Sequence, residues 1–473
     1  MTAAVAAVDL GASSGRVVLG HVGPDVLQIE AVARFANDPV LLPDGLHWNV
    51  VDLYARALEG LQVAGRKAGT ALAGLAIDSW AVDYGLVRGA SLLGLPFHYR
   101  DDRTTRGVER VHAVVPHDEL YRRNGLQFLT FNTLYQLAAD PWLHDAERML
   151  LVPDLLSWWL TGEMVTERTN ASTTGLLDAR TGAWDTELAG RLGIPSGLLT
   201  PLVEPGTTIG KLRPEVAEQI GVPHLAVTAV GSHDTASAVV GVPIQGDDAA
   251  YISCGTWGLV GLELEAPVLT DESRAANFTN EGGVDGRVRF LTNVMGLWLL
   301  SESMRAWQRA GVAESLDDIL AEAASLPPSR HLFDVQDLRF QPPGDLPARI
   351  LGWYDDAGLE PPSSRAALVR AIIDSLAQAF ADSVETAQSL SGHRVRTIHL
   401  VGGGSLNRLL CQETADRSGR VVLAGPVEAT AIGNVLVQGR TAGAISGGLE
   451  DLRRLVAATH AARKHVPRGR AGT

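Results

Sequence analysis

Two similar glycine-centred hairpins, roughly half the chain apart, constrain the fold more than any other feature of this sequence. Residues 5–19 read VAAVDLGASSGRVVL, and residues 251–264 read YISCGTWGLVGLEL. Each segment is typical of a strand, a tight turn that carries hydroxyl side chains, and a second strand. The repeat predicts two similarly built lobes that face each other. The alternative is a chance likeness, since any two β-hairpins of an α/β protein share this pattern.

Strands and helices alternate through the second half of the chain. The clearest helix is predicted over 365–390, where apolar residues recur every three to four positions. Ser363 or Ser364 is expected to cap its start, and Gly392 to end it. The alternation that follows predicts an α/β fold. Its strand, helix, strand and helix are expected at 397–401, 407–417, 420–424 and 428–440.

A cluster of Gly and Pro at 241–246 marks the predicted boundary between the lobes. We therefore expect an N-terminal lobe over 1–243 and a C-terminal lobe over 244–455. The last stretch, 456–473, is expected to be a basic tail, solvated from Arg463 onward.

Charge and composition exclude several classes of partner. The chain has 40 Lys and Arg against 54 Asp and Glu, and its net charge of −14 repels nucleic acid and anionic lipid. Its 2 cysteines allow one disulfide at most and no four-cysteine zinc site. No apolar run reaches the ~18 residues of a membrane span, and the N-terminus lacks a signal-peptide pattern. We expect a cytoplasmic protein that binds neither nucleic acid nor membrane.

The first hairpin turn, from Asp9 to Arg16, has the composition of a phosphate-binding loop. Gly11 and Gly15 would let backbone N–H groups converge on an anion. Ser13 and Ser14 add hydroxyl donors. Arg16 adds a fixed positive charge. Asp9, at the end of a buried strand, is a candidate ligand for the Mg²⁺ that accompanies a nucleotide. The alternative is an ordinary hairpin whose polar side chains satisfy their own turn.

Two further turns extend this interpretation to ATP. Thr256 gives the second hairpin a hydroxyl donor, and two facing loops of this kind would clamp a polyphosphate. Gly402, Gly403 and Gly404 follow a strand and open a helix, where adenine or ribose could approach the backbone closely. This turn does not match the G-x-G-x-x-G dinucleotide pattern, and the chain contains no G-x-x-x-x-G-K-[ST] P-loop. ATP would therefore be bound by another scaffold.

Asp234 is the expected chemical residue. It lies in GSHDTASA (231–238), after an apolar strand at 225–230 and at the start of an Ala-rich helix. An ionised carboxylate there can accept the proton of an alcohol that attacks a γ-phosphoryl group, and the helix dipole favours the ionised form. His233 is expected to donate to a substrate hydroxyl. The alternative is that Ser232 or Asp234 only caps the helix.

Side chains suited to a sugar gather in three segments. Carboxylate and amide groups bind sugar hydroxyls, and an aromatic face packs against C–H groups. Residues 77–84, IDSWAVDY, are interpreted as a strand that could line a cleft. Residues 99–103 and 293–298 offer similar groups, although a solvated ion-pair loop is at least as good an interpretation of 99–103.

In several places, always in the same order, the sequence resembles the FGGY family of carbohydrate kinases, and within it the branch that acts on L-rhamnulose. The resemblance runs from the first strand to about Gln438, and the joint order is more specific than any single motif. The segments are VDLGASSGR (8–16), IDSW (77–80), NTLYQL (132–137), SHDTASA (232–238), TNEGG (279–283) and GPVEA (425–429).

The resemblance implies an α/β fold of two actin-like ATPase (ribonuclease H-like) lobes with a central cleft. It further implies a kinase that uses ATP and Mg²⁺ to phosphorylate L-rhamnulose at O1, with Asp234 as proton acceptor. The positions that it assigns to ATP are Ala12, Ser13, Ser14, Gly15, Arg16, Thr256, Ser301, Gly402, Gly403 and Gly404. Those that it assigns to the sugar are Ala81, His233, Asp234, Thr235 and Asn293.

Two positions depart from the family's pattern. Ala81 stands where Gly is usual, which adds a methyl group where the backbone would meet the sugar. Ser301 stands where Gln is frequent, and its side chain is too short to make the same contact directly. The first departure bears on sugar specificity and the second on nucleotide affinity.

The sequence therefore predicts an ATP-dependent ketose kinase, a monomer or small homo-oligomer, with L-rhamnulose as the expected substrate. One alternative is a kinase for another ketose, such as L-fuculose or L-xylulose. The other is a non-catalytic sugar sensor or filament protein on the same fold. A sensor would usually carry an N-terminal DNA-binding domain or a cysteine-rich zinc site, whereas the first hairpin here begins within about ten residues of Met1.

Overall fold

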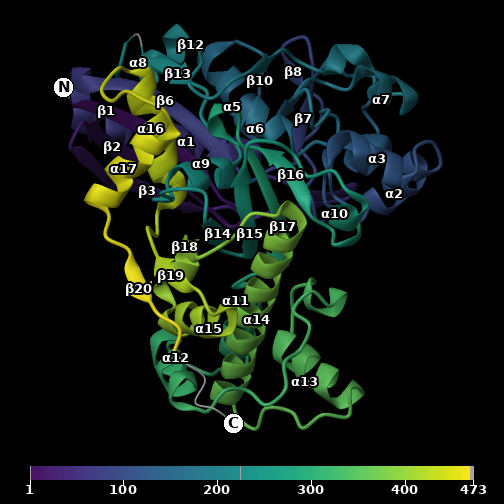
Figure 1. The fold of residues 1–473 in the computed structure, drawn as a ribbon. Coiled ribbons are helices and arrows are strands. Elements are labelled where there is room, and N and C mark those ends of the chain that lie inside the picture. Colours follow the sequence, from purple (N-terminus) through teal and green to yellow (C-terminus); the bar gives the residue numbers. More distant parts are fainter. Residues whose placement is uncertain (1, 224, 469–473) are drawn as a thin grey trace. The chain divides into compact units, whose positions relative to one another are not determined.

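The computed structural model describes residues 2–223 and 225–468, and the chain divides into two compact units (Figure 1). The first unit comprises the chain up to residue 245 together with 263–290 and 429–460. The second unit comprises the rest of the described chain. Because these units are interleaved in the sequence, the lobe bounds of 1–243 and 244–455 stay a prediction.

A six-stranded sheet in the order β12-β13-β6-β1-β2-β3 forms the frame of the first unit. β1 and β2 pair antiparallel, which confirms the first predicted hairpin. β6 pairs parallel with β1 on one side and with β13 on the other. These strands are β1 (Ala3–Leu10), β2 (Ser14–Gly23), β3 (Val26–Ala36), β6 (Leu72–Ser79), β12 (Thr208–Lys211) and β13 (Ala226–Thr228).

Shorter strands and most of the helices complete the first unit. The strands are β4 (Val40–Leu42), β5 (Gly45–His47), β7 (Tyr84–Arg88), β8 (Ser91–Leu92), β9 (Arg148–Leu151), β10 (Thr166–Glu167), β11 (Leu202–Val203) and β16 (Thr279–Gly282). The helices are α1 (Val50–Ala68), α2 (Thr104–His112), α3 (His117–Asn124), α4 (Thr133–Ala139), α5 (Val152–Thr161), α6 (Arg168–Ala171), α7 (Thr186–Arg191), α8 (Pro214–Ile220), α9 (Asp234–Val240), α10 (Asp271–Ala275), α16 (Ala429–Thr441) and α17 (Leu449–Thr459).

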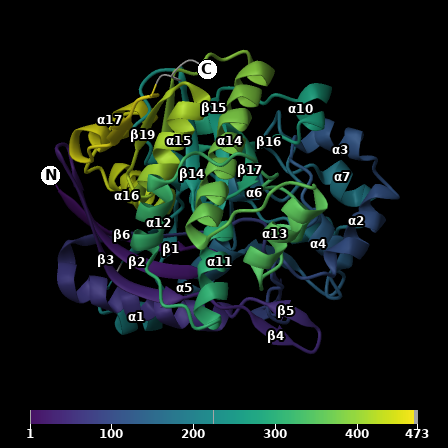
Figure 2. The same ribbon diagram turned by 90° about the horizontal axis from the view of Figure 1, so that it is seen from below.

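β1 is apolar at nearly every position because its two faces enter two different cores. Successive side chains of a strand point to opposite faces. Ala6 and Val8 pack in the core that contains residues of α1 and α5. Val5 and Ala7 pack in the core that contains residues of α16 and α17. Figure 2 shows α1 and α16 on opposite sides of these strands.

The interpretation of residues 77–84 as one strand is wrong. β6 ends at Ser79, and β7 begins at Tyr84 in a separate three-stranded sheet. Between them Val82 has a φ of 68°, and the Asp83 N–H donates to the Ala81 carbonyl at 2.9 Å. This tight turn ends the extended backbone.

The second unit contains the second predicted hairpin, which the antiparallel pairing of β14 with β15 confirms. β14 also pairs parallel with β18, and β18 with β19. The strands are β14 (Ala249–Cys254), β15 (Trp257–Leu264), β17 (Val288–Met295), β18 (Thr397–Val401), β19 (Val421–Ala424) and β20 (Arg463–His465), of which β15 and β17 extend into the first unit. The helices are α11 (Trp298–Arg309), α12 (Leu316–Ser325), α13 (Leu346–Asp356), α14 (Arg365–Ser391) and α15 (Arg408–Ser418).

α14 confirms the helix predicted from apolar spacing. The Ala367 N–H donates to the Ser364 side chain at 3.1 Å, and Gly392 ends the helix in the left-handed conformation with a φ of 74°. Figure 1 shows α14 as the long helix of this unit, and α12 and α15 pack against it. The strand predicted at 397–401 is β18.

The prediction of a solvated tail is wrong for residues 463–465. They form β20, which pairs antiparallel with β19 and so gives the edge of the sheet backbone partners. Arg468 follows it and donates to Asp416 Oδ2 through Nη2 at 2.6 Å. The remainder of the predicted tail, 469–473, lies outside the described residues.

Within the described chain, no helix has the length and apolar character that a membrane crossing requires. Cys254 and Cys411 are both buried and both free thiols.

α9 and α16 approach each other closely through glycines. A Cβ atom added to Gly433 would lie 1.8 Å from the Ser237 carbonyl oxygen, and one added to Gly241 would lie 2.3 Å from that of Ala429. Backbone atoms cannot rotate away as the end of a side chain can. Because α9 begins at Asp234, this contact fixes the helix that carries the expected chemical residue.

We expect Gly433→Ala to destabilise the protein by about 1–3 kcal/mol, the usual cost of overpacking. The control is Gly190→Ala in α7, where an added Cβ would meet nothing within 4 Å. There alanine should stabilise the helix by up to ~1 kcal/mol. Scanning calorimetry measures both, and equal melting temperatures for the two variants would contradict the close approach.

Candidate active site

Carboxylates gather at one edge of the first sheet because neighbouring parallel strands end there. Asp9 on β1 is the register partner of Asp78 on β6. The Ser79 N–H donates to the Ser232 carbonyl at 2.9 Å, and Ser79 forms a parallel bridge with His233. The chain therefore enters α9 beside the ends of β1 and β6. This is the edge at which open α/β sheets bind their ligands.

Asp234 is the first residue of α9, and its side chain is 29% exposed. Burial raises the pKa of its carboxyl; His233 lowers it, and the charge of Asp9 raises it. The net direction is upward, because burial outweighs His233 and the hydrogen bonds from Thr235, which lower the pKa. The capping alternative is also wrong: His233 is the N-cap and its side chain caps nothing, while Ser232 bonds to Glu167.

Asp78 lies at the same edge; sequence reasoning assigned its segment to the sugar but missed its pairing with Asp9. It is completely buried, and its Oδ2 accepts a hydrogen bond from Asn434 Nδ2 at 2.5 Å. Asn434 is held in turn by Gln438 Nε2, which donates to its Oδ1 at 2.7 Å. Burial and the charge of Asp9 raise the pKa of Asp78 well above its ordinary value. An acid at the very end of an apolar strand was the available signal.

The first hairpin turn couples its two charged residues. Arg16 donates to Asp9 Oδ2 through Nε at 2.8 Å and through Nη2 at 2.5 Å. The cation expected to face phosphate and the carboxylate expected to hold Mg²⁺ therefore compensate each other. At the tip of the turn Ser13 and Ser14 are exposed and Ala12 is half-buried.

Gly15 has a packing role that the sequence does not predict. It is buried, and a Cβ there would lie 2.2 Å from Cε2 of Phe35. The missing side chain makes room for this ring on β3. The glycine therefore serves packing, and the exposed part of the turn precedes it.

The protein alone cannot complete the coordination of Mg²⁺ at this edge of the sheet, so phosphate or water oxygens would have to supply the other ligands. Among the described residues, no group of three His, Cys, Asp or Glu side chains is placed to hold a metal ion. Mg²⁺ is commonly bound by one or two carboxylates and completes its shell with water and phosphate oxygens. Asp9, 5% exposed at the end of β1, can supply one such carboxylate.

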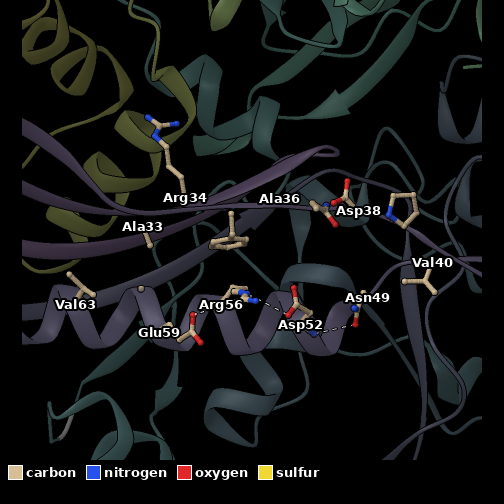
Figure 3. A pocket seen from close by; sticks show the side chains of 14 residues that line it. Ala33, Arg34, Ala36, Asp38, Val40, Asn49, Asp52, Arg56, Glu59 and Val63 are labelled. Atoms are coloured by element: carbon tan, nitrogen blue, oxygen red, sulfur yellow. Dashed lines mark hydrogen bonds and ion pairs between the residues drawn. The ribbon is translucent and has the colours of Figure 1, made fainter. Parts of the chain in front are cut away.

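A groove of about 730 Å³ lies between β3 and α1 (Figure 3). On its α1 side Arg56 lies 3.5 Å from Asp52 and 3.2 Å from Glu59, so one cation there is shared by two carboxylates. Asn37 also lines the groove, and its Nδ2 donates to the Gly11 carbonyl at 2.9 Å. A side chain of the groove wall thus holds the backbone of the first hairpin turn.

Glu167 holds the chain just before His233. Its Oε2 accepts hydrogen bonds from the Ser232 N–H and Oγ, both at 2.9 Å, and from Thr169 Oγ1 at 2.6 Å. Burial raises the pKa of Glu167, and these hydrogen bonds oppose the rise. Sequence reasoning missed this residue because its partner is 65 positions away.

Asp83 is an acceptor for buried protein groups and is only 1% exposed. Its Oδ2 accepts from Trp48 Nε1 at 2.5 Å and from Trp80 Nε1 at 3.0 Å. Its Oδ1 accepts from Gln136 Nε2 at 2.7 Å. Burial raises its pKa to about 6 against these hydrogen bonds. The Asp83 carboxylate and the Trp80 indole are therefore both engaged in hydrogen bonds within the protein.

The loop before Asp83 is fixed in a strained conformation. Val82, a β-branched residue, has a φ of 68°, and its carbonyl accepts from Thr133 Oγ1 at 2.7 Å. Ala81, the predicted sugar contact, is half-buried directly before it.

Residues 99–103 are solvated only in part, since Arg100 and Asp102 alone among them are exposed. Tyr99, Asp101 and Arg103 are all buried. The Leu46 N–H donates to Asp101 Oδ2 at 2.9 Å, and Arg103 Nη2 donates to Gln136 at 3.2 Å.

The second unit brings its two predicted nucleotide turns together. β14 and β18 are parallel neighbours, so the turn of Thr256 and the turn of Gly402 to Gly404 follow adjacent strand ends. A Cβ on Gly402 would lie 2.9 Å from the Cys254 carbonyl oxygen, and one on Gly404 2.5 Å from the Cys254 Sγ. Gly403 is exposed and has open space around it.

Ser301 and Asn293 flank the second hairpin in the same unit. The N–H groups of Gly296 and Trp298 donate to the Thr256 carbonyl, both at 3.2 Å, which joins the start of α11 to the hairpin turn. Ser301 is exposed in the first turn of α11. Asn293 lies on β17, where its carbonyl accepts from Gln336 Nε2 at 2.8 Å.

Comparison with known proteins identifies the family. The N-terminal domain of the "FGGY family of carbohydrate kinases" matches residues 4–241, and its C-terminal domain matches residues 250–442. The chain belongs to the FGGY family of carbohydrate kinases. A rhamnulokinase of Bacteroides thetaiotaomicron is 40% identical over 443 residues, 92% of this chain and 90% of the relative. One of Klebsiella pneumoniae is 42% identical over 441 residues, 91% and 88% of the two chains.

Solved structures of other kinases share the fold of this FGGY kinase. A xylulose kinase from Lactobacillus acidophilus has a TM-score of 0.80 at 18% identity, over 98% of this chain and 94% of that one. A Plasmodium falciparum glycerol kinase with ADP has a TM-score of 0.79 at 14% identity, over 99% and 94%. The α/β fold of two actin-like lobes that the sequence resemblance implies is thereby confirmed.

The buried Asp83 predicts a pH dependence of stability. Its pKa of about 6 in the folded protein exceeds the ordinary value of 3.8. A group whose folded pKa is raised stabilises the protein more as pH falls, here between about 6 and 4. The side chain of Asp83→Asn cannot titrate. We therefore expect the melting temperature of the native protein, relative to that of Asp83→Asn, to rise as the pH is lowered from 7 to 4. A constant difference across this range would contradict the raised pKa.

Proposed function

We propose that this FGGY kinase transfers the γ-phosphoryl group of ATP to O1 of L-rhamnulose, giving L-rhamnulose 1-phosphate and ADP. The observation that carries the proposal is the roughly 40% identity to rhamnulokinases over nine-tenths of both chains. The xylulose and glycerol kinases share the fold at less than half that identity.

Asp234 is the proposed proton acceptor. As O1 attacks the γ-phosphorus, the hydroxyl proton passes to the Asp234 carboxylate and ADP leaves with the electron pair of the broken P–O bond. Phosphoryl transfer has a loose transition state, so this residue acts mainly by orienting the hydroxyl and accepting its proton late. Glu167 supports this role by holding Ser232, two residues earlier, through two hydrogen bonds.

Asp9 is the proposed ligand of Mg²⁺, whose charge would offset that of the β- and γ-phosphates. On binding of the nucleotide, Arg16 would share its guanidinium between Asp9 and a phosphate oxygen. The proposed ATP contacts are Ala12, Ser13, Ser14, Gly15, Arg16, Thr256, Ser301, Gly402, Gly403 and Gly404. The proposed sugar contacts are Ala81, His233, Asp234, Thr235 and Asn293.

For the compartment, the oligomeric state and the partners of the enzyme, we keep the predictions made from the sequence. We infer a cytoplasmic enzyme, a monomer or small homo-oligomer, with the sugar and ATP as its partners and with no nucleic acid or membrane partner. The net charge of −14 supports the exclusion of nucleic acid and anionic lipid.

A coupled assay of ADP release over L-rhamnulose, L-fuculose and L-xylulose tests the substrate. We expect L-rhamnulose to give the highest kcat/KM, by at least about tenfold, the low end of the discrimination that a single methylene group provides. A higher kcat/KM for another ketose would overturn the substrate assignment. Tight sugar binding without ADP release would favour the sensor.

Asp234→Asn tests the proposed proton acceptor. The amide keeps the shape but cannot take a proton, so we expect kcat to fall by roughly 10²–10⁴-fold while sugar binding persists. Asp25→Asn, in the exposed turn between β2 and β3, is the control and should leave kcat unchanged. Isothermal titration gives the sugar affinity and the coupled assay gives kcat. Near-normal turnover of Asp234→Asn would rule out its catalytic role.

A further inference from the structure

A buried ion pair lies directly behind His233. Arg289 on β17 and Glu281 on β16 place Nη1 and Oε2 3.1 Å apart, and their side chains are 0% and 9% exposed. Arg289 Nε also donates to the Gly282 carbonyl at 2.9 Å, which fixes the guanidinium plane. Glu281 belongs to the TNEGG segment, to which the proposed mechanism assigns no role.

This pair determines where the ring of His233 carries its proton. Arg289 Nη2 lies 3.1 Å from His233 Nδ1. A guanidinium has only N–H donors and stays charged, so a hydrogen bond between the two groups requires the lone pair of Nδ1. The proton of the neutral ring is then on Nε2. That nitrogen lies 3.4 Å from Asp234 Oδ1.

The contact with His233 orients the Asp234 carboxylate. Thr235 Oγ1 also donates to Asp234 Oδ1, at 3.1 Å. Within the described chain both contacts fall on the same oxygen, Oδ1. Oδ2 is therefore the oxygen left to accept the proton of an attacking hydroxyl.

Glu281 allows the arginine to remain buried beside the ring. A single buried charge is costly, and the carboxylate compensates the guanidinium. Its Oε2 lies 3.3 Å from His233 Nδ1, the nitrogen that Arg289 also contacts. Without Arg289, an acceptor at this place would draw the ring proton to Nδ1 and away from Asp234.

We propose that Arg289 is a positioning residue: by donating to His233 Nδ1 it holds the Nε2–H form of the ring, which in turn fixes Asp234 for proton transfer. Glu281 is the counter-charge that keeps Arg289 in place. The proposal rests on the proposed role of Asp234. It gives a role to Arg289, a fully buried arginine on β17 that contacts the residue before α9.

The test uses the paired variant Arg289→Met/Glu281→Gln, which leaves no lone buried charge. In it the amide oxygen introduced at position 281 can accept from Nδ1–H, so the ring should change tautomer. We expect kcat to fall by about 10–100-fold, in the range that a misplaced reacting group costs, and by more than the sugar KM rises, since His233 is also a proposed sugar contact. The control is Arg453→Met/Glu263→Gln, a buried pair with 3% and 9% exposed side chains in the same unit, which should lower stability without lowering kcat.

A double-mutant cycle separates positioning from general support of the fold. His233→Gln replaces the ring by an amide that donates without a choice of tautomer. In that background the Arg289→Met/Glu281→Gln change should alter kcat by less than about threefold, because its route to Asp234 is gone. An undiminished loss of kcat in the His233→Gln background would overturn the proposal.

¹⁵N spectra of the histidine-labelled full-length enzyme report the tautomer without any turnover. The signal absent from His233→Gln identifies the ring, and we expect the Nε2–H form in the native protein and Nδ1–H in the paired variant. An Nδ1–H ring in the native protein would overturn the proposal even if Asp234→Asn is inactive. Conversely, an active Asp234→Asn enzyme with an Nε2–H ring would refute only the proposed role of Asp234.

Discussion

The repulsion between carboxylates at one sheet edge is the constraint to which the first unit is adapted. Asp9 and Asp78 are register partners on β1 and β6, and the charges of both Asp9 and Asp234 act on Asp78. Buried like charges raise each other's pKa unless donors or cations compensate them. Arg16 compensates Asp9, and the Asn434–Gln438 pair holds Asp78. The edge thus holds several carboxylates close together, and it would suit a ligand that is accompanied by a cation.

The rest of the unit holds that edge rigidly. β1 is fixed from both faces by two cores, and α9 is pressed against α16 at Gly433. Glu167 takes hold of Ser232 through two hydrogen bonds. A proton acceptor is effective when it is preorganised, and these buried polar contacts would preorganise Asp234 for its proposed role.

Local patterns of the sequence predicted the elements well. The two hairpins, α14 with its Ser364 cap and its Gly392 end, and β18 all follow from spacing and turn chemistry over a few neighbouring residues. The strand assigned to 77–84 failed because the turn at Val82 is imposed by Thr133, which lies far along the chain. The solvated tail failed because the edge of β19 offers backbone partners.

The candidate site was predictable only in part, for the same reason. Asp9 and Asp78 lie near strand ends and Asp234 begins a helix, and from these local signals the sequence analysis singled out Asp9 and Asp234. Glu167 and Arg289 act on Ser232 and His233 across 65 and 56 positions, so no local pattern marks them. The packing role of Gly15 had no local signal, because its neighbour Phe35 is supplied by another strand.

A crystal structure of the enzyme with L-rhamnulose and a non-hydrolysable ATP analogue is the most direct test of the account. It should place O1 of the sugar within about 3.2 Å of Asp234 Oδ2, the reach of a hydrogen bond, with the γ-phosphate on the far side of O1. A sugar bound with O1 out of reach of this carboxylate, or turned away from the γ-phosphate, would contradict it.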